Sequence, residues 1–184
     1  MITAVAPRDA ALARELDGRS KEFGKLVAER VANIGEQIAE LGTPFEFDAK
    51  GVALLPKGWR IEGDAADCDE KSVEGRECLR IRAAGDTTAS YRKSVNLEAG
   101  RYRFEARTRT RGVEPGDDES GEAAGVRISG AKRHGQNAAR GDTAWQTLGF
   151  DFETDGGSVI LVAELRAKAG EVWFDKSSLR LVRR

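Results

Sequence analysis

Residues 101–111 alternate between two kinds of side chain, and this pattern constrains the fold more than any other part of the sequence. Tyr102, Phe104 and Ala106 recur at every second position, and charged or polar residues stand between them. Successive side chains of a β-strand point to opposite faces, so the pattern predicts a half-buried strand. Its outward positions are expected to be Arg101, Arg103, Glu105, Arg107, Arg109 and Arg111.

Further strands are expected on both sides of this one. Residues 78–83 also alternate, with Leu79 and Ile81 inward. The turn signals at 98–100, 155–157 and 169–170 help to separate the remaining segments. Strands at such short spacing, with no helices between them, predict an all-β antiparallel sandwich or barrel. The other expected strands are 58–63, 87–97, 124–130, 145–154, 158–167 and 171–183.

The N-terminal segment has a different period. Apolar residues over 8–42 recur mostly every three or four positions, which predicts a helix. We expect a break near Gly18, where the sequence resembles a turn, and a helix end at Gly42 and Pro44. Two interpretations stay open: an oligomerisation or docking helix, or a connector that packs its apolar stripe locally. The predicted organisation is a helical segment or connector at 1–43 and a β-module at 44–184.

Composition narrows the function. The 184 residues fit one domain with an appendage, and 30 basic against 31 acidic residues give a net charge of −1. This balance argues against a generic nucleic-acid binder, which carries a basic excess. No apolar run approaches the roughly 18 residues of a membrane-spanning helix. The first ten residues have no basic stretch followed by an apolar core, so they do not read as a signal peptide.

Cysteine and histidine are scarce. Cys68 and Cys78 are the two cysteines and His134 the one histidine, too few for the four ligands of a structural zinc site. In an exported protein, Cys68 and Cys78 could form a disulfide across a hairpin-like loop. Two unpaired, half-buried thiols are the alternative.

Five short motifs resemble the galactose-binding-like jelly roll, especially carbohydrate-binding modules of the family 4, 9 and 22 type. They cover residues 44–183 in the expected order. The opening departs from the family pattern because Thr43 stands where Asn is common. The motifs lie at 44–46 with 56–59, at 74–81, at 97–102, at 145–152 and at 172–179.

The resemblance implies a structural calcium site. An acidic residue of the opening segment would meet an aspartate of the closing strand, here Glu46 and Asp175. Calcium needs six to eight oxygen ligands, and the backbone of the 74–76 turn, with Arg76 as the best candidate, would add to them. The alternative is that Asp175 is a turn residue and Glu46 a solvated carboxylate.

The resemblance also implies sugar binding through an exposed aromatic ring. Trp59 and Trp145 stand at family positions where the ring packs in the core, whereas Trp173 alternates with Phe174 and is the candidate platform. Arginine binds carboxylate or sulfate in a bidentate manner, so Arg103, Arg107 and Arg109 are candidates for binding an acidic polysaccharide. The alternative is a solvated face on which acidic residues of neighbouring strands pair with these arginines.

The sequence shows no catalytic signature. His134 is isolated, no nucleophile motif is present, and the glycines do not have phosphate-loop spacing. The resemblance implies a non-catalytic jelly-roll module, a sandwich of two antiparallel sheets, that belongs to a larger exported bacterial protein and lies outside the cell or on its surface. Its partners would be a polysaccharide or other glycan and neighbouring domains. The alternative is a structural or protein–protein interaction module that does not bind sugar.

Overall fold

The computed structural model describes residues 17–27, 45–63, 67–116, 123–132 and 137–184. The chain divides into two units, Met1–Gly42 and Thr43–Arg184. In the first unit, residues 17–27 are helical, so the expected break near Gly18 does not occur within this range. Phe23, Leu26 and Val27 are exposed on this helix. The rest of the predicted 8–42 helix, with its expected end at Gly42, lies outside the described residues.

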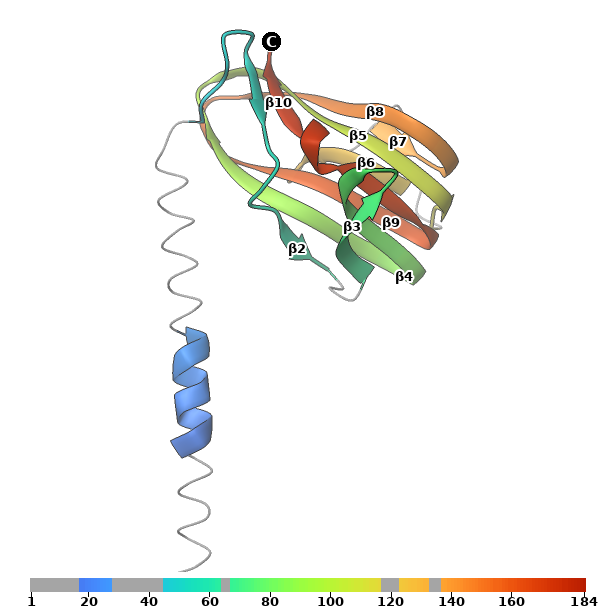
Figure 1. Ribbon diagram of the computed structural model, residues 1–184. Coiled ribbons are helices and arrows are strands. Elements are labelled where there is room, and N and C mark those ends of the chain that lie inside the picture. Colours follow the sequence, from blue (N-terminus) through green and yellow to red (C-terminus); the bar gives the residue numbers. More distant parts are fainter. Residues whose placement is uncertain (1–16, 28–44, 64–66, 117–122, 133–136) are drawn as a thin grey trace, which may run out of the picture. The chain divides into compact units, whose positions relative to one another are not determined.

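The second unit is built from antiparallel strands, which confirms the all-β prediction (Figure 1). The strands are joined in one ten-stranded sheet that curls on itself into two layers, which correspond to the two sheets of the expected sandwich. A 3-10 helix, η3 (Lys176–Ser178), precedes the last strand. The strands are β1 (Val52–Leu54), β2 (Arg60–Glu62), β3 (Cys68–Val73), β4 (Arg76–Leu97), β5 (Gly100–Glu114), β6 (Ala123–Ile128), β7 (Ala138–Ala139), β8 (Gly141–Thr154), β9 (Gly157–Asp175) and β10 (Arg180–Arg183).

Two long strands connect the two layers of the curled sheet. β4 and β9 pair from Cys78 opposite Asp175 to Leu97 opposite Gly157, with a register shift after Ala84. The first half of β4 lies beside β3 and its second half beside β2. The second half of β9 pairs with β5 and its first half with β6. Each long strand therefore contributes to both layers.

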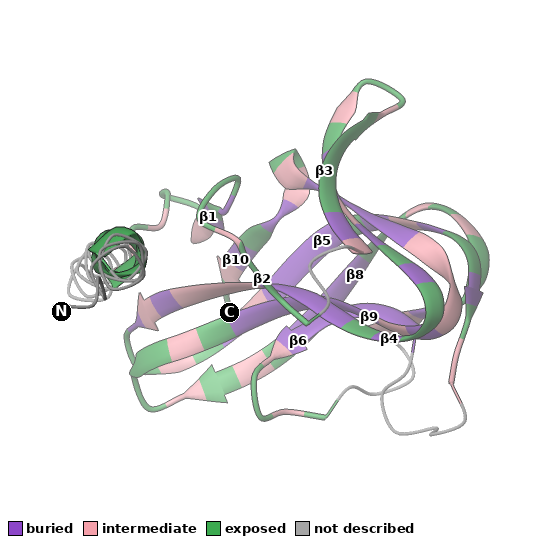
Figure 2. Cartoon of the chain, turned by 90° about the horizontal axis from the view of Figure 1, so that it is seen from below, coloured by how far each residue is buried: buried purple, intermediate pink, exposed green. Residues whose placement is uncertain are grey.

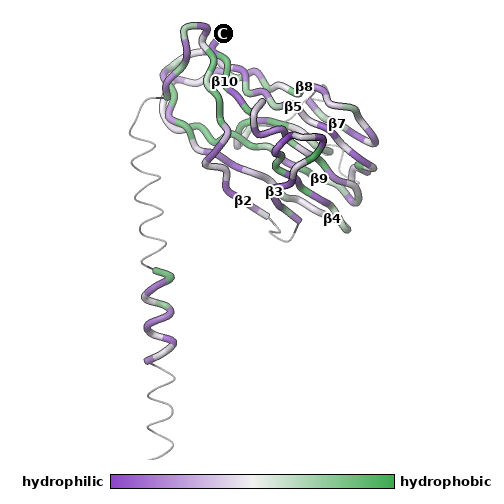
Figure 3. Tube along the Cα trace, in the orientation of Figure 1, coloured by the Kyte–Doolittle hydropathy of each residue, from purple (hydrophilic) through white to green (hydrophobic). Residues whose placement is uncertain are grey.

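The core lies between these layers and is lined by the predicted inward residues. Tyr102, Phe104 and Ala106 of β5 are buried, as their alternation predicts. The period-two burial and hydropathy of the strands can be followed in Figures 2 and 3. Trp59 packs at the edge of the core, with its ring 5.9 Å from that of Phe104 and its Nε1 donating to Leu55 O at 2.7 Å. This placement agrees with the core position expected for Trp59.

The expected turn at 169–170 is instead an irregularity inside β9. Leu161, Ala163 and Leu165 face the core before it, and Val172 and Phe174 face the core after it, so the inward phase changes from odd to even positions. Gly170 has a φ of +99°. A glycine within a strand often marks such a change or a close backbone approach, and here it lets β9 continue from one layer to the other.

Candidate functional site

The outer face of β5 carries a row of arginines, as the alternation predicts, which we call the arginine stripe: Arg101, Arg103, Arg107, Arg109 and Arg111. On one side, Arg103 lies opposite Asp151 of β8 and Arg107 lies opposite Thr147. On the other side, Arg109 lies opposite Trp173 of β9. The stripe thus crosses a sheet surface to which several strands contribute side chains, and the partners differ along its length.

The first part of the stripe is neutralised by acidic neighbours. Arg103 forms ion pairs with Asp151 and with Glu105, whose Oε1 lies 2.8 Å from the Arg103 Nε. Arg180 of β10 binds the other oxygen of Glu105 at 2.6 Å. These contacts are those of the alternative stated for this face, in which acidic residues of neighbouring strands pair with the arginines. They give this end of the stripe a structural role.

Glu105 makes this end of the stripe sensitive to acid. Burial alone would raise its pKa, but hydrogen bonds from Arg180 and Arg103 outweigh burial, and the pKa lies below its ordinary value of 4.5. A carboxylate with a lowered folded-state pKa stabilises the fold above its unfolded-state pKa. That contribution is lost as pH falls through the folded-state pKa.

We therefore expect Glu105→Gln to lower the melting temperature by a constant amount between pH 6 and 8, with the difference shrinking below about pH 4.5. Thermal melts of the wild type and the variant across pH measure this difference. A difference that is independent of pH down to pH 3 would contradict the role given to the Glu105 charge.

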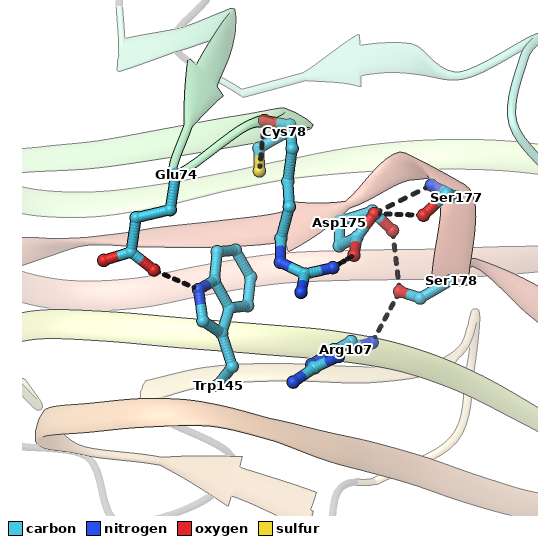
Figure 4. A network of polar contacts seen from close by, with 8 residues as sticks. Glu74, Cys78, Arg107, Trp145, Asp175, Ser177 and Ser178 are labelled. Carbon is cyan, nitrogen blue, oxygen red and sulfur yellow. Dashed lines mark hydrogen bonds and ion pairs between the residues drawn. The ribbon is translucent and has the colours of Figure 1, made fainter.

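The second part of the stripe lies beside Trp145 of β8. We call this region the Trp145 patch and define it as Glu74, Arg76, Arg109 and Trp145. Trp145 Nε1 donates to Glu74 Oε2 at 2.9 Å, and Arg109 donates to the other Glu74 oxygen. The Arg76 guanidinium lies 5.6 Å from the centroid of the Trp145 ring. Figure 4 shows the Trp145 ring beside Glu74, with its Nε1 turned toward the carboxylate. The hydrogen bonds from Trp145 and Arg109 lower the pKa of Glu74.

The position of Trp145 differs from the expected core position. Trp145 is only partly buried on the outer face, while Leu148 and Phe150 of the same strand are buried. Positions 148, 150 and 152 share one phase and residue 145 has the other, so the alternation within β8 indicates an outward ring. The family resemblance alone led to the core assignment. Glu74, at φ 53° in the turn between β3 and β4, had no signal in the sequence as a partner of Trp145.

Trp173, the expected platform, does lie on the outer face, but it is covered. Its exposed fraction is 4%, because the guanidinium groups of Arg109 and Arg111 lie 6.0 and 5.4 Å from its ring centroid. Its buried Nε1 has no hydrogen-bond partner among the described residues. The Trp173 ring is therefore buried beneath two arginine side chains and is not an open stacking surface.

Arg107 stands between these two regions. Its backbone nitrogen donates to Ser178 Oγ at 2.8 Å, and that hydroxyl donates to Asp175 O at 2.7 Å. The residue is exposed, and within the described part of the chain its guanidinium has no ion-pair or hydrogen-bond partner. The contacts fix the backbone of Arg107 and leave its charge available on the surface.

The residues expected to bind calcium do not fit a shared ion. Asp175 is buried, and its carboxylate accepts hydrogen bonds from Arg76 Nη1 at 2.9 Å and from Ser177 Oγ at 2.6 Å. A guanidinium thus occupies the position that a cation would take. Glu46 is exposed and precedes the turn at 48–51, which bonds to Arg183, so it lies near the opposite end of β10 from Asp175. Among the described residues, no cluster of three His, Cys, Asp or Glu side chains could hold a metal.

The two cysteines are both buried and unbonded to each other. In the β3–β4 register, Cys68 lies opposite Ile81 and Cys78 lies opposite Lys71. Three residues of offset correspond to about 10 Å along a strand, beyond the Cα separation of a disulfide. Burial raises the pKa of Cys78 to about 11, which keeps it a thiol at neutral pH. His134 lies outside the described residues.

A pocket of about 400 Å³ opens at the other end of the stripe. Its charged lining contains two arginines and two acidic residues, so it has no excess of either charge. The pocket is lined by Arg101, Tyr102, Asp151, Phe152, Glu153 and Arg184.

Within the described residues, no helix has the length and apolar character needed to cross a bilayer.

No family model and no curated protein matches this chain. Solved structures with a similar arrangement of strands include carbohydrate-binding modules, the class that the sequence motifs also resemble. One is TmCBM61 in complex with beta-1,4-galactotriose, 16% identical with a TM-score of 0.47, covering 76% of this chain and 92% of that one. A family 35 module from Clostridium thermocellum is 14% identical with a TM-score of 0.46, over 71% and 96% of the two chains. A CBM4 structure is 18% identical with a TM-score of 0.44, over 79% and 97%.

Proposed function

We propose that this chain is a non-catalytic module that binds a glycan through the Trp145 patch. The observation that carries the proposal is the partly exposed Trp145 ring, whose orientation is fixed by Glu74 and Arg76 on the outer face of a sheet. Aromatic residues with one polar group offer a large contact area at low conformational cost. An apolar ring surrounded by charged hydrogen-bonding groups matches a sugar, which has apolar ring faces and a rim of hydroxyls.

The proposal extends to the setting of the module. We propose that it belongs to a larger exported bacterial protein and attaches neighbouring domains to a glycan, as the sequence motifs imply. Rigid strands of the sheet present Trp145 and Arg109, and elements of this kind hold a site more precisely than loops do. A site for recognition alone needs no nucleophile or general base, and the one carboxylate of the Trp145 patch, Glu74, is bound by Trp145 and Arg109.

Replacing Trp145 by alanine should weaken glycan binding at least about tenfold, because a central aromatic residue of a binding site typically contributes about 2 kcal/mol or more. Affinity electrophoresis against neutral and acidic polysaccharides measures the loss. Trp145→Phe keeps a ring but removes the hydrogen bond to Glu74, so we expect an intermediate affinity. Ile61→Ala, at an exposed position of β2 in the other layer, is the control and should bind as the wild type does.

Two outcomes would count against this proposal. If the wild type binds none of the polysaccharides tested, the module is structural or binds proteins. If Trp145→Ala binds a glycan as tightly as the wild type, the site lies elsewhere. Trp145 is not among the buried core residues, so we expect both Trp145→Ala and Trp145→Phe to fold.

A further inference from the structure

We infer that the glycan bound at this face is anionic, with carboxylate or sulfate groups that are bound by Arg107, Arg109 and Arg111. The inference rests on the proposed glycan binding and adds the charge of the ligand. It depends on three features of the face: the uneven pairing of the arginine stripe, a buried indole donor without an acceptor, and the spacing of the three arginines along β5.

The pairing of the stripe changes between its two parts. Arg103 is paired on both sides, as described above. Arg107 has no acidic partner among the described residues, and its cross-strand neighbour Thr147 is neutral. Arg111 is 67% exposed and reaches Glu171 only at 3.4 Å, while the other Glu171 oxygen lies 3.5 Å from Arg80. Arg109 pairs with Glu74, so the three arginines have only Glu74 and a shared Glu171 as acidic partners among the described residues, and positive charge is in excess from Arg107 to Arg111.

Trp173 supplies the second feature. Its side chain is more than nine-tenths buried beneath the guanidinium groups of Arg109 and Arg111, and its Nε1 makes no hydrogen bond in the described residues. A buried donor without an acceptor costs about 1–3 kcal/mol and calls for an explanation. An anionic oxygen held by Arg109 and Arg111 at the edge of the ring, in the plane of the indole, would give this Nε1 the acceptor that it lacks.

The third feature is the regular spacing of the arginines. Three outward positions at every second residue place the backbones of successive arginines about 7 Å apart along β5. Arginine binds carboxylate and sulfate through two parallel N–H groups. A polymer with regularly spaced anions can contact two or three of them at once, and the neighbouring Trp145 ring can hold the sugar to which an anion is attached.

Three dextrans with one backbone test the inference: neutral dextran, carboxymethyl-dextran and dextran sulfate. We expect the wild type to bind at least one charged form at least about tenfold more tightly than the neutral form, with affinity falling as salt rises. The double variant Arg107→Gln/Arg111→Gln should lose that preference. Arg60→Gln removes an exposed charge from β2 in the other layer and should keep it. Comparison of the two charged forms tells carboxylate from sulfate.

The outcomes separate the inference from the proposed function. Equal affinity for neutral and charged dextrans, lost in Trp145→Ala, would overturn the anionic class and leave glycan binding intact. A preference for charged dextran that Arg107→Gln/Arg111→Gln retains would place the anion site elsewhere and overturn the inference. Binding of polyglutamate as tight as that of carboxymethyl-dextran would show that the face binds anions without recognising sugar, which overturns the proposed function. Absence of all binding overturns both.

Discussion

Replacing Gly170 by alanine should destabilise the β-module more than any other single methyl addition at a described glycine. A Cβ at this position would lie 2.3 Å from Gly112 O and 2.6 Å from the Val113 Cα, both backbone atoms of β5. Its φ of +99° lies in a region that L-residues seldom adopt. Left-handed strain costs about 1–2 kcal/mol and overpacking about 1–3 kcal/mol, so we expect a total loss of about 2–5 kcal/mol in the free energy of unfolding.

Gly112→Ala is the matched control for this prediction. Gly112 also has a positive φ, +57°, but a Cβ there meets no atom within 4 Å. It should therefore cost only the backbone strain, about 1–2 kcal/mol. Urea unfolding followed by fluorescence measures both variants. Equal losses for Gly170→Ala and Gly112→Ala would show that β9 can shift away from β5, and the close approach would then not be what fixes the crossing between layers.

At Gly170, strand β9 passes from one layer of the sheet to the other, and the sequence pattern did not predict this continuous strand. Alternation identified β5, β8 and both halves of the long strands because one face of each is buried. It could not show that residues 78–83 and 87–97 form one strand, β4, since a bulge within a strand and a turn between strands have the same local composition. β1, β3 and β7 were missed because they are short or, in the case of β3, exposed along most of their length.

For the candidate site, the sequence predicted the direction of several side chains but not the contacts that they make. The outward direction of the arginines and of Trp173 follows from period two alone. What covers Trp173 does not, because Arg109 and Arg111 reach over it from the neighbouring strand β5. Trp145 was assigned to the core from a family motif although the alternation of β8 indicates an outward ring. Asp175 was expected to bind calcium, but the side chain of Arg76, which no sequence pattern places, binds its carboxylate.

Replacing Glu164 by leucine should cost about 3–5 kcal/mol of stability, because it would leave the buried charge of Arg127 without its partner. Arg127 Nε and Nη2 donate to the two Glu164 oxygens at 2.8 and 2.9 Å. The exposed fractions of the two side chains are only 9% and 2%. A loss below about 1 kcal/mol in urea unfolding would fit a well-hydrated surface pair and contradict the burial of this one.

The double variant Arg127→Met/Glu164→Leu distinguishes the cost of an unpaired charge from the value of the pair itself. Replacing both partners by apolar side chains removes the desolvation cost of two ions, so the double variant should recover most of what Glu164→Leu loses. The Arg166 side chain is 36% exposed, but its Nε, 3.5 Å from Glu164, is buried and gains no acceptor in the double variant, so the recovery should be incomplete. The pair joins β6 to the half of β9 before Gly170, whereas Trp173 and Asp175 lie after it, so a folded double variant should bind glycan as the wild type does. Loss of both stability and binding would instead show that the two halves of β9 are coupled through the crossing, and the glycan site would then depend on the packing of both layers.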